Sequence, residues 1–265
     1  PPAWSVTWRF ALAAAGMALL ALWRGERLVL DRRGHLLAAG IGLAQFCINF
    51  NFVYQAELHI TSGLVAVLFA LLMVPNAVLG RLVLGTPVTP RFIIGTAIAL
   101  AGIGLMLAHE ARAAPMGMAV WLGVGLTAVA IMSASVANVA QAMPVARRQP
   151  ILVLLAYAMG WGALADCAWA WASAGPPLLV LDARYLGGVV YLALIGSVVA
   201  FPLYFQLIRD IGPARAAYSG VLVPVVAMVL STLFEGYRWS WLAAAAGALA
   251  LAGLVVALRA RNPMK

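Results

Sequence analysis

Polar side chains recur at helical spacing inside segments of the chain that are otherwise apolar. Their hydroxyl and amide groups belong to Gln45, Asn49, Thr127, Ser135, Asn138 and Ser197. Residues three, four or seven positions apart share one face of a helix, as Gln45 and Asn49 do. Such groups can hydrogen-bond the ammonium or carboxylate of a small ligand without carrying a full charge. They predict either a polar ligand site among helices or hydrogen bonds that join helix to helix.

Aromatic side chains stand close to these polar groups. Phe201 and Tyr204 follow Ser197 by four and seven residues, so the three share one helix face. Aromatic rings stack on an aromatic ligand or attract its ammonium group, at about 0.5–2 kcal/mol per contact. Contacts this weak suit a protein that must release its ligand. We therefore add Phe201, Tyr204, Tyr218 and Trp161 to the candidate substrate-binding residues, with core packing as the alternative for Trp161.

Three prolines, Pro75, Pro202 and Pro224, lie inside apolar segments of helical length. Proline removes one backbone hydrogen bond and bends a helix. Inside a membrane, such a break is tolerated where neighbouring helices or water satisfy the freed carbonyl. The three prolines are predicted hinges, and static kinks are the alternative interpretation.

Residues that would support enzymatic chemistry are sparse. The chain has three histidines and two cysteines, and none has the spacing of metal ligands. His59 and His109, together with Glu57 and Glu110, could meet at one face, which keeps an integral-membrane enzyme as a competing interpretation. We expect no catalytic residue, no cofactor and no metal.

Asp166 is the only acidic residue well inside an apolar segment. A proton-coupled antiporter usually needs a titratable carboxylate in its pathway. Asp166 lies five residues before Trp171, close enough to the outer end of its segment for water to reach it. The sequence therefore favours movement down the solute's own gradient over obligatory exchange for protons.

The elements that position these residues follow from composition. The chain is 65% apolar and 9% charged, with a mean hydropathy of +1.00, which leaves too little polar surface for a water-soluble domain of 265 residues. A helix needs roughly 20 apolar residues to cross a bilayer. Nine segments qualify, at about 4–23, 36–57, 61–84, 91–109, 117–140, 151–173, 185–207, 213–235 and 240–259. Short connections predict a single all-α integral membrane bundle.

The chain also matches itself at an offset of 151 residues. Tyr54-Gln55 meets Phe205-Gln206, and Ala99–Gly102 meets Ala250–Gly253 without a gap. This predicts two halves, 1–112 and 113–265, with the first half lacking its first helix. Ten helices, five plus five, would place the second half upside down relative to the first. Inverted repeats are a recurrent device for alternating access, with the substrate site near the midplane.

Two stripes of small residues stand at equivalent positions of this repeat. They are Gly95-Ala99-Gly102 and Ala246-Ala250-Gly253. Small residues spaced by about one helical turn let two helices approach closely. The stripes are predicted to be structural, packing the outer helices against their neighbours.

Positive charge predicts the orientation in the membrane. With the C-terminus in the cytoplasm, thirteen of the seventeen Lys and Arg residues fall on the inside, including the cluster Arg24, Arg27, Arg32 and Arg33. The opposite orientation would invert that ratio. The cationic residues form short clusters between apolar segments rather than one basic face, which argues against a nucleic-acid partner.

Several motifs resemble the drug/metabolite transporter superfamily, EamA type. The opening from Pro2-Ala3 to Trp8-Arg9-Phe10 is similar to the start of that family's second helix. Ile211-Gly212-Pro213-Ala214 and Phe234-Glu235-Gly236 are similar to its penultimate-helix pattern, and Ala246–Gly253 is similar to its last helix. In this chain Met73 stands where the second half has Pro224.

This resemblance implies ten helices around a central cavity in a bacterial inner membrane, surrounded by lipid. Within the superfamily, the chain resembles exporters of aromatic amino acids and their analogues. Other members' cargoes, such as drug-like cations, nucleosides or other metabolites, remain the alternative. The oligomeric state is left open.

Overall fold

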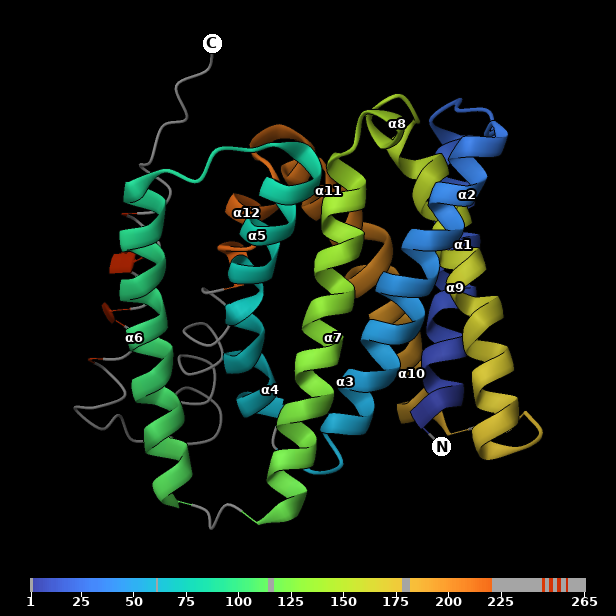
Figure 1. Ribbon diagram of the computed structural model, residues 1–265. Coiled ribbons are helices and arrows are strands. Elements are labelled where there is room, and N and C mark those ends of the chain that lie inside the picture. Colours follow the sequence, from blue (N-terminus) through green and yellow to red (C-terminus); the bar gives the residue numbers. More distant parts are fainter. Residues whose placement is uncertain are drawn as a thin grey trace. The chain divides into compact units, whose positions relative to one another are not determined.

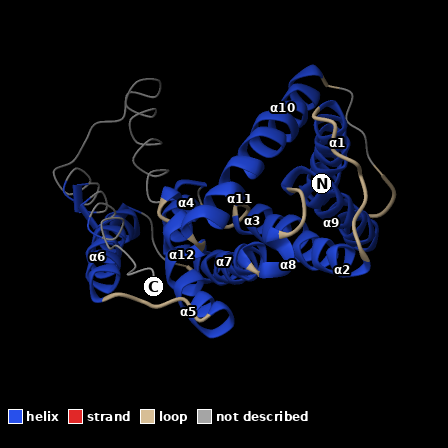
Figure 2. Ribbon diagram, turned by 90° about the horizontal axis from the view of Figure 1, so that it is seen from above, coloured by secondary structure: helices blue, strands red, loops and turns tan. Residues whose placement is uncertain are grey.

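The computed structural model describes residues 2–60, 62–113, 117–177 and 182–220, together with isolated positions between 245 and 256. Every element in this part of the chain is a helix, and none of its residues forms a strand (Figure 2). The structure therefore confirms the predicted all-α fold.

Seven of the nine predicted spans are helical at the expected places. Among the described residues, six helices are long and apolar enough to cross a membrane: Pro2–Trp23, Arg32–Ala56, Leu64–Leu84, Met118–Ala142, Ile151–Ala174 and Ala183–Ile211. The seventh, α6 (Pro90–Ala113), has the shorter apolar stretch Pro90–Gly102. The predicted spans 213–235 and 240–259 lie largely outside the described residues.

Two of the spans contain a π-helical segment. In the first, α2 (Arg32–Ile41) continues through η1 (Gly42–Asn49) into α3 (Phe50–Ala56). In the second, α10 (Ala183–Ala193) continues through η3 (Leu194–Val199) into α11 (Ala200–Ile211). Each π segment widens the helix and leaves backbone carbonyls for other donors, an arrangement that is frequent at functional sites.

These two spans correspond at the repeat offset. Adding 151 to the limits of η1 gives 193–200, which brackets η3. Their N-caps correspond as well, because the side chain of Asp31 accepts from Gly34 N and that of Asp182 accepts from Tyr185 N. Helices at equivalent positions of the chain thus share both a starting signal and an internal irregularity.

A third span is interrupted by a tighter turn. It consists of α4 (Ser62–Phe69), the 3₁₀ segment η2 (Ala70–Leu72) and α5 (Met73–Leu84). Pro75 lies just after η2, and Pro202 lies just after η3. The two predicted hinge prolines that the structure describes thus follow non-α segments, as expected where an i→i−4 hydrogen bond is missing. Pro224 lies outside the described residues.

The chain forms two compact units, and each draws on both predicted halves. Unit 1 consists of residues 1–54 and 136–211, and unit 2 of residues 55–135 and 212–265. Helix α7 (Met118–Ala142) contributes its first part to unit 2 and its last part to unit 1. The short helix α8 (Pro144–Arg147) belongs to unit 1, and α12 (Pro213–Ala216) belongs to unit 2.

Unit 1 is built around the antiparallel pair α1 (Pro2–Trp23) and α9 (Ile151–Ala174), which lie side by side in Figure 1. The indole of Trp4, near the start of α1, donates to Gly175 O, just past the end of α9, at 3.2 Å. At the opposite end, the hydroxyl of Tyr157 donates to Leu28 O at 3.0 Å. The two helices are equivalent at the repeat offset, and they run in opposite directions.

Glycine permits the closest approach in unit 1, where η1 crosses α9. A Cβ atom on Gly42 would stand 2.3 Å from Ala158 O, and one on Gly162 would stand 2.6 Å from the Phe46 Cβ. Real Cβ atoms do not approach other atoms this closely. Glycine at both positions lets the two backbones come together.

In unit 2, glycine also permits a close approach, where α6 meets Gly253. A Cβ atom on Gly253 would lie 2.5 Å from Ala99 N and 2.6 Å from Gly95 O. The two predicted small-residue stripes therefore meet at the one residue of the second stripe that the structure describes. A separate core of unit 2 packs the ring of Tyr218 on Phe92, with centroids 5.6 Å apart.

Candidate functional site

Aromatic rings form a continuous cluster inside unit 1. Its members are Phe10 of α1, Phe46 of η1, Phe50 of α3, and Phe201, Tyr204 and Phe205 of α11. Phe201 occupies the middle, with its centroid 5.0 Å from that of Phe46 and 6.2 Å from that of Phe50. Phe50 and Phe201 are equivalent at the repeat offset, so the cluster joins the corresponding helices of the two halves.

An amide group lies at the edge of this cluster. Asn138 is 1% exposed, and its Nδ2 donates to the Tyr204 hydroxyl at 3.2 Å. Its Oδ1 has no hydrogen-bond partner. The predicted residues Asn138, Phe201 and Tyr204 are therefore brought together, and the amide retains a free acceptor beside aromatic rings.

Gln45 and Asn49 lie in the π segment η1, and both are buried. Asn49 Nδ2 donates to Gln45 O at 3.3 Å, which uses a carbonyl within the segment. The side-chain oxygens Gln45 Oε1 and Asn49 Oδ1 remain without partners. An unpaired buried polar atom is costly, so it usually marks a bound water or a ligand position.

Ser197 lies in the other π segment and receives a buried guanidinium. Arg9 of α1 is 7% exposed, and its Nε donates to Ser197 Oγ at 3.2 Å. Its Nη2 donates to Gly196 O at 3.5 Å, while Ser197 Oγ donates to Leu192 O at 3.0 Å. The guanidinium carbon lies 4.5 Å from the centre of the Phe50 ring, and the Tyr54 hydroxyl is beside it. This is a cation–π arrangement in a desolvated setting.

Asp166 of α9 is fully buried, contrary to the expectation that water reaches it. Its Oδ1 accepts from Asn51 Nδ2 at 2.6 Å, and the Cys47 thiol lies beside the carboxylate. Asn51 Nδ2 also donates to Cys47 O at 3.0 Å. The other oxygen, Oδ2, has no partner. Linear distance to a helix end does not reveal which way a side chain faces, and the Asp166 carboxyl faces the interior of unit 1.

Three of the remaining predicted residues belong to unit 2, and the fourth, Trp161, belongs to unit 1. Thr127 and Ser135 are buried on the part of α7 that belongs to unit 2, and Thr127 Oγ1 donates to Gly123 O at 2.8 Å. The Tyr218 hydroxyl in unit 2 is hydrogen-bonded to Thr96 Oγ1 at 2.6 Å. Trp161 of α9 is 44% exposed and lies outside the aromatic cluster.

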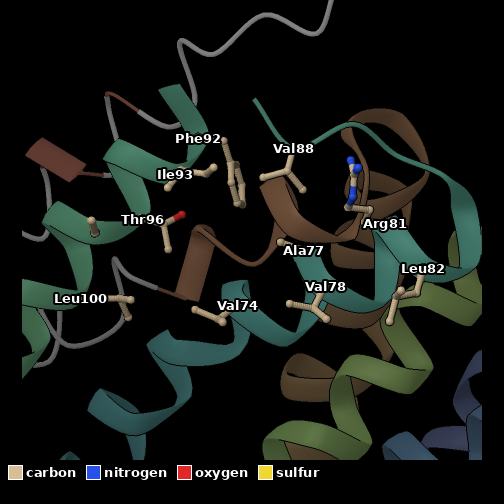
Figure 3. A pocket seen from close by; sticks show the side chains of 11 residues that line it. Val74, Ala77, Val78, Arg81, Leu82, Val88, Phe92, Ile93, Thr96 and Leu100 are labelled. Atoms are coloured by element: carbon tan, nitrogen blue, oxygen red, sulfur yellow. The ribbon is translucent and has the colours of Figure 1, made fainter. Parts of the chain in front are cut away.

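Unit 2 contains a pocket of about 360 Å³ between α5 and α6 (Figure 3). Its walls are apolar except for Thr96 and Arg81. The volume falls within the range of small-molecule sites. None of the predicted substrate-binding residues lines it, although Thr96 is the partner of Tyr218.

Sequence reasoning missed several contributors to the unit 1 interior: Arg9, Phe10, Phe46, Phe50, Asn51 and Phe205. The repeat offset contained a usable signal, since Phe50 corresponds to Phe201 and Asn51 to Pro202. Asn51 supplies a side-chain donor to Cys47 O, a carbonyl of the π segment η1. Asn51 and Pro202 are thus different residues at equivalent positions, and each lies just after a π segment.

The fold and this interior define a polytopic helical membrane protein with a polar and aromatic centre. The sequence profile of the EamA-like transporter family matches residues 1–108 and 121–259, and the chain belongs to that family. It is therefore a membrane transporter of the drug/metabolite transporter superfamily, with a small molecule as its substrate.

Two relatives and one solved structure are similar to most of this chain. YedA of Escherichia coli K12, described as an uncharacterized inner membrane transporter, is 31% identical over 87% of this chain and 74% of its own length. PagO of Salmonella typhimurium is 23% identical over 91% of this chain and 78% of its own. A protein of known crystal structure, 20% identical, has the same fold with a TM-score of 0.74, over 97% of this chain and 88% of its own.

Proposed function

We propose that this protein exports small organic solutes, aromatic amino acids and their analogues, from the bacterial cytoplasm by alternating access. The observation that carries the proposal is the aromatic cluster of unit 1, with Phe201 at its centre and the free amide oxygen of Asn138 at its edge. Rings favour stacking on an aromatic side chain, and a free amide oxygen accepts a hydrogen bond from a polar group of the ligand.

Two antiparallel halves would supply the mechanism. The helices α1 and α9 are equivalent at the 151-residue offset and run in opposite directions, and the π segments η1 and η3 correspond as well. The family match also falls into two ranges, one in each half. Pro75 and Pro202, which follow non-α segments, are the hinges in this proposal.

The membrane and its orientation follow from relatives and charge. YedA is described as an inner membrane transporter, which supports the same membrane here. Placing the C-terminus in the cytoplasm puts most Lys and Arg residues on the inside.

The proposed transport is facilitative, and Asp166 is central to that choice. It is the one buried carboxylate among the described residues, and its Oδ1 is held by Asn51. A carboxylate engaged in a fixed hydrogen bond is poorly placed to pick up and release a proton in every cycle.

Purified protein in proteoliposomes tests the proposal. Labelled tryptophan, phenylalanine and tyrosine should leave loaded vesicles down their gradients with no pH difference across the membrane, and each should compete with the others. An absence of downhill flux would overturn facilitative transport. Flux of a cation such as methyl viologen, without flux of aromatic amino acids, would overturn the substrate class.

Variants at the aromatic edge test the site itself. Tyr204→Ala and Asn138→Ala should change the order of preference among the three amino acids while the protein remains folded. Tyr191→Ala is the matched control, because Tyr191 is 62% exposed on the same membrane span. Unchanged preference in both site variants would show that the site lies elsewhere.

A further inference from the structure

Unit 1 buries two opposite charges that do not pair with each other. The partners of Arg9 are a hydroxyl, a carbonyl, a phenol and two aromatic rings. The partners of Asp166 are the amide of Asn51 and the thiol of Cys47. Among the described residues, no carboxylate faces Arg9 and no cation faces Asp166.

The two charges lie at the same level of the unit. Arg9 is seven residues from the start of α1, and Asp166 is eight residues from the end of α9. The start of α1 lies against the end of α9, because Trp4 donates to Gly175 O. At 1.5 Å per residue, each charge is therefore about 10–12 Å from those helix ends, inside the apolar span.

Both charges also contact the same short stretch of a third helix. Arg9 lies over the ring of Phe50 and beside Tyr54, and Asp166 binds Asn51. These three residues fall within little more than one turn of α3. Arg9 and Asp166 thus both contact one turn of α3. Arg9 contacts Phe50 and Tyr54, and Asp166 contacts Asn51.

Leaving two buried charges without counter-ions is expensive in the low dielectric of a membrane protein. Direct pairing would relieve the cost, yet each charge is held by other partners. A zwitterionic ligand would give each of them a counter-ion, because its anion can bind Arg9 and its cation can bind Asp166. An amino acid has such charges on one carbon atom, with its carboxylate and ammonium side by side.

We propose that Arg9 and Asp166 recognise the zwitterionic head of the transported amino acid, with Arg9 binding the α-carboxylate and Asp166 Oδ2 accepting from the α-ammonium. The inference rests on the proposed function, which it deepens by naming the groups that bind the main chain of the substrate. The guanidinium has five N–H donors, so it can bind a carboxylate while it keeps its hydrogen bond to Ser197 or to Gly196. The aromatic cluster around Phe50 and Phe201 then binds the side chain of the transported amino acid.

Three probes that differ only in charge test this assignment: tryptophan, tryptamine, which lacks the carboxylate, and indole-3-propionate, which lacks the ammonium. Binding is measured on the purified full chain. Arg9→Gln should weaken tryptophan roughly 10-fold to 100-fold and leave tryptamine within about twofold. Asp166→Asn should weaken tryptophan by a similar factor and leave indole-3-propionate nearly unchanged.

Conservative variants separate recognition from folding. Arg9→Lys and Asp166→Glu keep the charge, so the preference for tryptophan over the matching analogue should survive even where overall affinity falls. Arg33→Gln and Asp210→Asn remove exposed charges of the same unit and should alter none of the three affinities. Thermal unfolding of each variant identifies any that fail to fold, and the conservative pair then carries the test.

The outcomes distinguish this inference from the proposed function. If the wild type binds tryptophan, but each variant loses all three probes equally or loses none, the assignment of Arg9 and Asp166 is overturned while aromatic amino acid transport stands. If the wild type prefers leucine or threonine and the charge variants behave as expected, the aromatic substrate class falls and the zwitterion site stands. Binding of no amino acid at all overturns both.

Discussion

The two compact units differ in what they bury. Unit 1 encloses Arg9 and Asp166, the only charged residues that are buried in the described part of the chain. The buried polar groups of unit 2 are neutral. Some are hydrogen-bonded, as Asn76 Nδ2 is to Pro213 O, while Asn76 Oδ1 and Ser135 Oγ have no partner. Its pocket between α5 and α6 is almost wholly apolar.

This difference indicates that the two units have different roles in the protein. Neutral, mutually bonded groups hold helices together at modest cost. Buried charges cost stability, so they are expected where a ligand repays that cost. We infer that recognition belongs to unit 1, and that the described part of unit 2 contributes packing.

The largest effect is expected where helices touch through glycine. Gly42→Ala should destabilise the protein by about 3 kcal/mol or more, because the new Cβ would overlap Ala158 O. Gly253→Ala should do the same for unit 2, against Ala99 N. Thermal unfolding in detergent measures both.

Gly40→Ala is the control for this pair, since a Cβ at that position meets nothing within 4 Å. It should be neutral or slightly stabilising in a helix. A Gly42→Ala protein as stable as the wild type would contradict the close contact of η1 with α9.

The next effect compares one asparagine from each unit. Asn51→Leu should cost about 2–3 kcal/mol, because it removes a donor to the Asp166 carboxylate and leaves that charge buried without it. Asn76→Leu removes only a bond to the neutral Pro213 O, and should cost about 1 kcal/mol. Equal losses in chemical denaturation would remove the distinction between a charged and a neutral interior.

A smaller effect is expected from the neutral pair of unit 2. Thr96→Val keeps the shape of the side chain and removes its hydrogen bond to Tyr218, at a cost of about 1 kcal/mol. Flux in proteoliposomes should remain near the wild-type rate. A variant that folds but no longer transports would bring the pocket of unit 2 into the transport route.

The smallest effect is expected at Trp161. Because its side chain is 44% exposed, Trp161→Leu should change the free energy of unfolding by less than about 0.5 kcal/mol. Melting curves test this directly. A shift in preference among aromatic amino acids in the same variant would add Trp161 to the site.

Much of the candidate site could be predicted from helical spacing. Ser197, Phe201 and Tyr204 fall on one face in the sequence, and Tyr204 does meet a second predicted residue, Asn138. Spacing within one helix cannot show which face turns toward which neighbour. For that reason Phe46 and Phe50 were missed, and Trp161 was grouped with buried residues although its side chain is 44% exposed.

The length of the apolar segments and the 151-residue offset determined the positions of the helices. A membrane span must form its backbone hydrogen bonds within itself and must be apolar wherever it meets lipid. Those local requirements leave a clear mark on the sequence. Only the tertiary structure decided that Arg9 and Asp166 lie at one level without pairing and that glycines bring η1 against α9. Side-chain direction and helix contact depend on neighbours distant in the chain, and no local pattern records them.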